Sequence, residues 1–291
     1  MVASVAKGKG IVLSGYHLQL ISDKAKKGEA GGEVSLDLGI SKSEFSIDKK
    51  VVSFSGCDAR LDLGTIARIL GKRRHNDCFL LRGDSPPAWI YLFSDDYGVV
   101  KLYEPKMDWP PTLFINGSYM HTIGVSKPTE EAFKKANALG GTTGNVLETG
   151  FGLGYSSMWL RKLGAGKVIA CEKSPDVIEI AKANPWSRGA FADRSIELNA
   201  VDAAEFIKTL PSSSVDGILH DPPNFNKSEY LYSAAFYADA YRVLKPKGRM
   251  YHFIGTMTKE NARIHNNVVR NIRASGFSAV SPSYRGVTAT K

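Results

Sequence analysis

The sequence predicts an α/β protein: a mostly parallel sheet with helices on both faces, preceded by a β-rich N-terminal domain. From residue 121 onward, apolar strand patterns alternate with helical patterns, which is typical of parallel sheets. The first strand of this series runs into a glycine-rich turn, Gly150-Phe-Gly-Leu-Gly154. Polar residues follow the next strands. Because parallel strands bring their carboxyl ends to one edge, these features predict a ligand site at that edge.

Length and composition limit the classes to which the chain can belong. Its 291 residues suffice for two domains, which we place at 1–120 and 121–291. No apolar run reaches the roughly 18 residues of a membrane helix, and the first ten residues lack the apolar segment of a signal peptide. The three cysteines lack metal-ligand spacing, so we expect a cytoplasmic protein without a metal site or disulfides.

The formal net charge is +9, and it is unevenly distributed. Residues 126–291 carry 22 Lys and Arg against 15 Asp and Glu, whereas the preceding part carries 16 against 14. A basic surface of this kind is compatible with a polyanionic substrate such as a nucleic acid. A generally basic proteome is the alternative explanation.

Residues 1 to about 120 show the alternation of apolar and polar residues that is typical of strands. The expected strand regions are 11–21, 33–40, 44–54, 77–82, 88–94 and 97–103. A helix is expected near 61–70, where Leu63, Ile66 and Leu70 fall on one face. Since this part contains no catalytic constellation, we expect it to frame or recognise the substrate.

The remaining elements alternate in order along the chain. A helix is expected to begin at Pro128 and to end before Gly140, because acids follow the proline and two glycines follow the helix. The expected strands are 145–149, 167–172, 195–199, 215–220, 249–253, 277–280 and 286–290. The expected helices between them are 155–163, 175 to before Pro185, 203 to about 209, 230–243 and 259–275.

Two stretches at the strand ends suggest the chemistry of the site. Glu172 follows the glycine turn by about 20 residues, where a nucleotide ribose needs a carboxylate for its hydroxyls. Asp221-Pro-Pro-Asn-Phe225 then supplies a carboxylate and carbonyl oxygens that could hold an amine and direct its lone pair at a methyl group. Phe225 offers a face for a stacked base. An ordinary turn is the alternative for the Asp-Pro-Pro segment.

These motifs resemble those of class I S-adenosylmethionine-dependent methyltransferases, in the order Gly150–Gly154, Glu172, Asp202 and Asp221–Phe225. Within that class, the chain is similar to a predicted archaeal branch with a His-Asp-Pro-Pro-x-Phe motif. The similarity covers roughly Asn116 to the C-terminus. It includes the segments Met120-His121, Asn184-Pro-Trp-Ser187, His220–Phe225, Tyr241–Gly248 and Tyr251-His-Phe253.

The resemblance implies a Rossmann-like fold, S-adenosylmethionine as cofactor, and roles for individual residues. It implies that Glu148, Gly150, Gly152 and Gly154 hold the methionine part of the cofactor. Glu172 would then bind the ribose and Asp202 the adenine amine, while Asp221, Pro222 and Phe225 would hold the target amine and its base. The chain departs from the Asp-Pro-Pro-aromatic pattern at Asn224, so either Phe225 or Tyr230 would stack on the base, and Asn224 would bond a base edge.

The substrate that the resemblance implies is RNA, with cytosine N4 of small-subunit ribosomal RNA slightly ahead of adenine N6 and guanine N2. An aminopropyltransferase of similar fold, a methyltransferase acting on a small molecule or a protein, and a non-catalytic RNA-binding module remain alternatives.

Four further features each have two interpretations. His220 and His252 would relay a proton or serve as structural histidines, and Trp186 would cover the adenine or pack as an ordinary core residue. The basic residues Lys259, Arg263, Arg270 and Arg273 would follow a phosphate backbone or form a solvated helix face.

Overall fold

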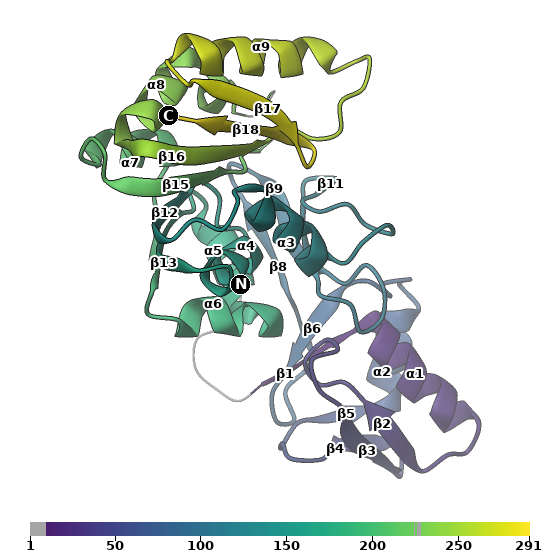
Figure 1. Ribbon diagram of the computed structural model, residues 1–291. Helices are drawn as coiled ribbons and strands as arrows, with labels where there is room; N and C mark the ends of the chain where they lie inside the picture. The colour runs from purple at the N-terminus through teal and green to yellow at the C-terminus, as the bar shows by residue number, and fades with distance from the viewer. Residues whose placement is uncertain (1–9, 224, 226–227) are drawn as a thin grey trace. The chain divides into compact units, whose positions relative to one another are not determined.

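The computed structural model describes residues 10–223, 225 and 228–291, so the predicted site residue Asn224 lies outside the described residues. The chain divides into two compact units (Figure 1). The first comprises the chain up to Pro128 together with Asp176–Arg188, and the second comprises Thr129–Pro175 and Gly189–Lys291.

The first unit is built on small antiparallel sheets, as the β-rich prediction requires. Its strands are β1 (Ile11–Ser14), β2 (Gly31–Val34), β3 (Ser43–Asp48), β4 (Val51–Phe54), β5 (Arg60–Asp62), β6 (Cys78–Leu81), β7 (Ala88–Trp89), β8 (Tyr91–Ser94), β9 (Gly98–Tyr103), β10 (Thr112–Ile115) and β11 (Ser118–Tyr119). Their sheet orders are β1-β6-β7, β2-β3-β4-β5 and β11-β10-β9-β8. The helix α2 (Leu63–Leu70) lies where the apolar face predicted it.

The expectation of a strand over 11–21 is wrong beyond Ser14, because helix α1 occupies Gly15–Lys26. Ser14 caps this helix: its hydroxyl accepts from the Tyr16 backbone N–H, and its own N–H donates to His17 Nδ1 at 3.0 Å. The buried residues Leu18 and Ile21 belong to the core of this unit, so tertiary packing selects the helix over the alternating pattern.

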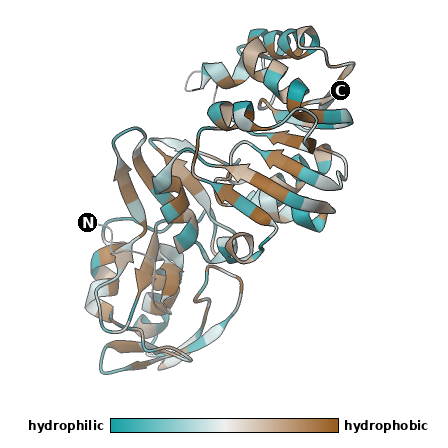
Figure 2. Cartoon of the chain, turned by 90° about the vertical axis from the view of Figure 1, so that its left-hand side faces the viewer, coloured by the Kyte–Doolittle hydropathy of each residue, from teal (hydrophilic) through white to brown (hydrophobic). Residues whose placement is uncertain are grey.

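The second unit contains a seven-stranded sheet with the order β14-β13-β12-β15-β16-β18-β17. Its strands are β12 (Gly144–Glu148), β13 (Ala165–Cys171), β14 (Ile196–Asn199), β15 (Val215–His220), β16 (Leu244–Phe253), β17 (Ala279–Ser283) and β18 (Gly286–Thr290). The first five pair in parallel, and β18 runs antiparallel to β16 and β17. Figure 2 shows apolar residues along the central strands, which contribute to the core of this unit.

The helical elements that follow in the chain are α3 (Pro128–Ala138), α4 (Tyr155–Lys162), α5 (Pro175–Ala183), the 3₁₀ turn η1 (Pro185–Ser187), α6 (Arg188–Ala192), α7 (Ala203–Thr209), the 3₁₀ turn η3 (Glu229–Tyr232), α8 (Ala234–Val243) and α9 (Ala262–Ala274). The helix expected from Tyr230 thus begins at Ala234, because the Ser233 hydroxyl caps the Phe236 N–H. None of the described helices has the length and apolarity to cross a membrane.

The strand order reverses at β12, since β13 lies on one side of it and β15 on the other. In open α/β sheets a ligand crevice forms outside the carboxyl ends of the strands at such a switch point. The glycine turn follows β12 and the Asp221 segment follows β15. The fold therefore brings the two predicted motifs to the same edge of the sheet.

Candidate functional site

The glycine turn after β12 contacts the ends of both neighbouring strands. The Thr149 N–H donates to the Leu219 carbonyl of β15 at 3.1 Å, and the Phe151 N–H donates to the Cys171 carbonyl of β13 at 2.9 Å. A Cβ atom at Gly150 would lie 2.9 Å from the Asp221 carbonyl oxygen, so the close approach of the two segments requires glycine. Gly154 has φ 72° at the N-cap of α4, a conformation that glycine adopts without strain.

Glu172 is held beside this turn by backbone donors. Its Oε2 accepts from the Gly152 N–H and its Oε1 from the Ser174 N–H, both at 3.0 Å. Burial raises the pKa of Glu172. A carboxylate has about four lone-pair sites, so these two bonds leave acceptor capacity for the hydroxyls of a ribose.

Glu148, at the end of β12, has a fully buried carboxyl group. The Ser157 hydroxyl donates to its Oε2, and its Oε1 has no hydrogen-bond partner within the described part of the chain. Burial raises the pKa of Glu148 to about 7. A buried acceptor without a donor is costly, so this oxygen fits a cationic amino group such as that of a methionine moiety.

Asp202 caps helix α7, since its Oδ1 accepts from the Ala204 N–H at 2.8 Å. Its Oδ2 accepts from the Tyr230 hydroxyl at 2.6 Å and lies 3.2 Å from Lys173 Nζ. Burial, together with this bond, raises the pKa of Tyr230 to about 12. An adenine amine at Asp202 would therefore share this carboxylate with Tyr230.

Asp221 follows β15 and pairs with Lys135 of α3, whose Nζ lies 2.7 Å from Asp221 Oδ2. No hydrogen bond from the described residues reaches Asp221 Oδ1. Sequence reasoning missed Lys135. Its burial did have a signal, because Lys135 lies on the i, i+3, i+4 stripe of α3 with the buried residues Ala132 and Ala136.

The Pro-Pro segment is held by its second carbonyl. The Pro223 oxygen accepts from the Ser228 and Tyr232 hydroxyls, both at 2.9 Å. The structure gives no hydrogen bond from the described residues to the carbonyl of the buried Pro222. The half-buried Phe225 contacts Tyr232 edge to face at a centroid distance of 5.3 Å. Asp221 Oδ1 and the Pro222 oxygen are thus two acceptors at one strand end.

The two histidines near this edge are buried, and their lowered pKa values keep both rings uncharged at neutral pH. Thr149 Oγ1 lies 2.8 Å from His220 Nδ1, and His220 Nε2 lies 2.9 Å from the Leu231 carbonyl. Burial lowers the pKa of His220 to about 3 and that of His252 well below its usual value. This environment fits the structural interpretation of both histidines.

The remaining candidates lie outside this cluster. The Trp186 indole N–H donates to the Leu38 carbonyl at 2.8 Å within the first unit, where it anchors a chain turn. On α9, Arg263, Arg270 and Arg273 are exposed on the side opposite the buried face of the helix. Among the described residues, no group of three or more His, Cys, Asp or Glu side chains could hold a metal ion.

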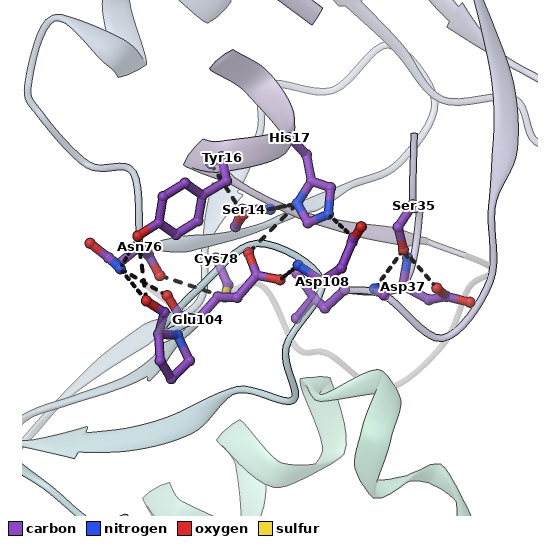
Figure 3. A network of polar contacts seen from close by, with 12 residues as sticks. Ser14, Tyr16, His17, Ser35, Asp37, Asn76, Cys78, Glu104 and Asp108 are labelled. Carbon is purple, nitrogen blue, oxygen red and sulfur yellow. Dashed lines mark hydrogen bonds and ion pairs between the residues drawn. The ribbon is translucent and has the colours of Figure 1, made fainter. Parts of the chain in front are cut away.

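The first unit contains a buried polar network that the sequence did not predict (Figure 3). His17 Nδ1 contacts Ser14 Oγ at 2.8 Å, and His17 Nε2 contacts Asp108 Oδ1 at 3.1 Å. Glu104 accepts from the Asp108 N–H at 3.0 Å, and burial raises the pKa of Glu104 to about 7. Ser14, His17 and Glu104 are fully buried, so the network braces the start of α1.

Comparisons with known proteins agree with the fold. Residues 146–248 match the sequence pattern of a family described as a methyltransferase domain. The chain is 34% identical over 254 residues to the uncharacterized protein MJ1233 of Methanocaldococcus jannaschii, with 84% of each chain covered.

Two solved structures of spermidine synthase share the fold. One, in complex with the transition-state analogue AdoDATO, aligns with a TM-score of 0.58 and 17% identity over 69% of this chain and 72% of that chain. The other, from Thermotoga maritima, aligns with a TM-score of 0.54 and 17% identity over 69% and 70% of the two chains. At this identity the likeness concerns the fold alone.

The switch point of the sheet, the glycine turn and the matched family pattern point to one conclusion about residues 146–248. Residues 146–248 form a Rossmann-like methyltransferase domain, with S-adenosylmethionine as its cofactor. The chain as a whole belongs to the same family as the uncharacterized protein MJ1233.

Proposed function

We propose that this protein transfers a methyl group from S-adenosylmethionine to an exocyclic amine of an RNA base. The observation that carries the proposal is the position of Asp221 and Pro222 at the end of β15, against the glycine turn at Gly150. The paired Asp221 keeps one carboxylate oxygen for a substrate, next to a proline carbonyl. These acceptors suit the two N–H groups of a neutral amine.

The cofactor would be held along the carboxyl edge of the sheet. Glu148, Gly150, Gly152 and Gly154 would hold its methionine part, Glu172 its ribose, and Asp202 its adenine amine, at the positions described above. Bound there, the cofactor supplies an electrophilic methyl group whose transfer forms a nitrogen–carbon bond, breaks a carbon–sulfur bond and leaves one proton to be released from the amine.

The residues of the chain position the amine for this transfer. Asp221 Oδ1 and the Pro222 carbonyl would accept its two N–H bonds, so that the nitrogen lone pair is directed away from the carboxylate. Since both nearby histidines are buried and neutral, no strong base assists, and catalysis rests on orientation. Phe225 or Tyr230 would stack on the base, and Asn224 would bond a base edge.

RNA is the substrate class best supported by charge and resemblance. The second unit carries exposed arginines on α9, and the net charge of the chain is +9. Its motifs also resemble those of the methyltransferase branch named above. We propose cytosine N4 of small-subunit ribosomal RNA as the methylated atom, ahead of adenine N6 and guanine N2. The reaction would take place in the cytoplasm, with RNA as the partner.

The second candidate is an aminopropyl transfer to a polyamine, which the shared fold with spermidine synthase favours. Such a substrate is a dication and needs uncompensated acids. Here Lys135 already pairs with Asp221, and prolines rather than a second acid follow it. The methyl-transfer function is therefore the better supported of the two.

One assay separates these functions. The protein is incubated with S-adenosylmethionine labelled in its methyl group and with total unmodified RNA, and the nucleosides are analysed by mass. We expect a methylated cytidine, while methylated adenosine or guanosine would change only the target base. The proposal fails if RNA stays unlabelled. In that case, decarboxylated S-adenosylmethionine with putrescine tests the aminopropyl alternative by product mass.

A further inference from the structure

Lys135 is a buried lysine of the second unit. Only 4% of its side chain is exposed, and its Nζ lies 2.7 Å from Asp221 Oδ2 and 3.5 Å from Glu131 Oε1. The same Nζ stands 3.9 Å from the centre of the Phe253 ring. Burying an ammonium group is costly unless carboxylates or aromatic faces compensate it. Two carboxylates and one aromatic ring surround the Lys135 ammonium group.

These contacts join three elements at the proposed amine site. Lys135 and Glu131 lie one turn apart on α3, Asp221 follows β15, and Phe253 ends β16. Glu131 Oε2 also lies 3.7 Å from Arg285 Nη1, so the charges continue as an alternating series. The arrangement fixes the Asp221 carboxylate on one side only, through Oδ2.

Two consequences follow for Asp221. Its Oδ1 is the oxygen left for a substrate, and its orientation is set because the other oxygen is held by a buried partner. Its negative charge is also compensated at short range, and charge-assisted contacts of this kind are stronger where water is excluded. The site therefore presents an acceptor without a net negative charge.

We propose that Lys135 is a positioning and specificity-determining residue, which orients Asp221 toward the acceptor amine and makes the site select neutral amines over ammonium ions. The proposal rests on the function proposed above. Helix α3 precedes the cofactor motifs in the chain. In this proposal its residue Lys135 lets the site discriminate between a base amine and a polyamine.

A binding experiment tests this without any RNA. Sinefungin carries an ammonium group at the place of the transferable methyl. S-adenosylhomocysteine has no charged group at that place. We expect Lys135→Met to shift the ratio of the two dissociation constants toward sinefungin by about tenfold, because Asp221 loses its compensating charge. The exposed neighbour Lys134 provides the matched control, and both Lys134→Met and Lys135→Arg should keep the wild-type ratio.

The design allows for loss of folding. Because Lys135→Met leaves the buried Glu131 without this partner, the double variant Glu131→Gln/Lys135→Met is measured in parallel by melting and by the same binding ratio. Adding Asp221→Asn to Lys135→Met should return the ratio to the wild-type value. An unchanged ratio in a folded variant that lacks Lys135 would overturn the proposal.

Methylation assays distinguish this proposal from the function on which it rests. If the wild-type protein labels no RNA, the proposed function fails, while the inhibitor ratio still decides whether Lys135 compensates Asp221. If RNA is labelled, Lys135→Met should lower kcat about a hundredfold with little change in KM for RNA, and Lys135→Arg should recover most of it. A Lys135→Met enzyme with wild-type kcat would contradict the positioning role.

Discussion

At the scale of single residues, the site depends on carboxyl groups whose surroundings differ. Glu148 is fully buried beside a serine hydroxyl, Glu172 accepts two backbone N–H bonds, and Asp221 pairs with a buried lysine. The same functional group thus has three electrostatic environments within one strand edge. Each environment leads to a different expected response to mutation or pH.

Asp221 should be essential for methyl transfer and dispensable for cofactor binding. We expect Asp221→Asn to lower kcat by about a hundredfold or more, since the amide presents a weaker or misdirected acceptor to the amine. Isothermal titration should give an unchanged dissociation constant for S-adenosylmethionine. Glu205→Gln, an exposed substitution on α7, is the control. Full turnover by Asp221→Asn would remove this residue from the mechanism.

Glu148 should make cofactor binding depend on pH. Its pKa is about 7 in the free protein, and a cationic amino group at its open oxygen would lower that pKa. Binding then releases a proton, so affinity for S-adenosylmethionine should increase as pH rises from about 5.5 to 7. Titrations in buffers of different ionisation enthalpy would measure this release. Glu148→Gln should flatten the dependence, and an equally steep curve in that variant would rule out the assignment.

At the scale of elements, the strands and helices at this edge are well encoded by local sequence, and the side-chain contacts between them are not. The buried strands β12, β13 and β15 and the glycine turn follow from short apolar runs and glycines. The pairing of Lys135 with Asp221 spans 86 positions, so no local pattern reveals it.

Helix α1 shows a second limit of sequence reasoning. Residues 11–21 alternate as a strand would, yet the chain turns into a helix at Gly15. The cap that starts this helix uses His17. His17 Nε2 contacts Asp108 Oδ1 at 3.1 Å, although the two residues are 91 positions apart in the sequence. Helix α1 and the pairing of Asp221 thus depend on partners distant in sequence, both apolar and polar, whereas β15 was predicted with its observed bounds.

The exposed arginines of α9 lead to a prediction about salt. Helix α9 contains no acidic residue, and none of its three exposed arginines is paired within the described chain. If they follow RNA phosphates, the triple variant Arg263→Gln/Arg270→Gln/Arg273→Gln should weaken RNA binding. It should also reduce the slope of log affinity against log salt by about 2.

The matched control for α9 uses three exposed lysines that already pair with glutamates. These are Lys167, Lys182 and Lys208, which contact Glu197, Glu179 and Glu205. Their combined replacement by glutamine changes the net charge equally and should leave the salt slope near that of the wild type. Equal losses in both triple variants would indicate a response to net charge alone.

At the scale of the whole molecule, stability should depend on Glu104, a buried group of the first unit with no part in the proposed chemistry. Burial raises the pKa of Glu104 to about 7, compared with 4.5 for a free side chain. An acid whose pKa is raised by folding destabilises the fold when it ionises, so its cost is absent below about pH 4.5 and complete above about pH 7. We expect Glu104→Gln to stabilise the protein at pH 8 by on the order of 2 kcal/mol.

Chemical unfolding of the wild type and of Glu104→Gln across pH 5 to 8 would measure this effect. The advantage of the variant should shrink steadily toward the acidic end, while the exposed substitution Glu33→Gln should show none of this trend. A constant difference between variant and wild type would mean that Glu104 does not titrate in this range.

The division of the chain also has a consequence for biosynthesis. The first unit includes Asp176–Arg188, which the ribosome makes only after the first two strands of the large sheet. Domains generally fold as they emerge during synthesis, from the N-terminus onward. Here the N-terminal part lacks one of its segments until synthesis has passed Arg188. A truncated gene that stops at Pro128 would accordingly yield a fragment lacking part of its own fold.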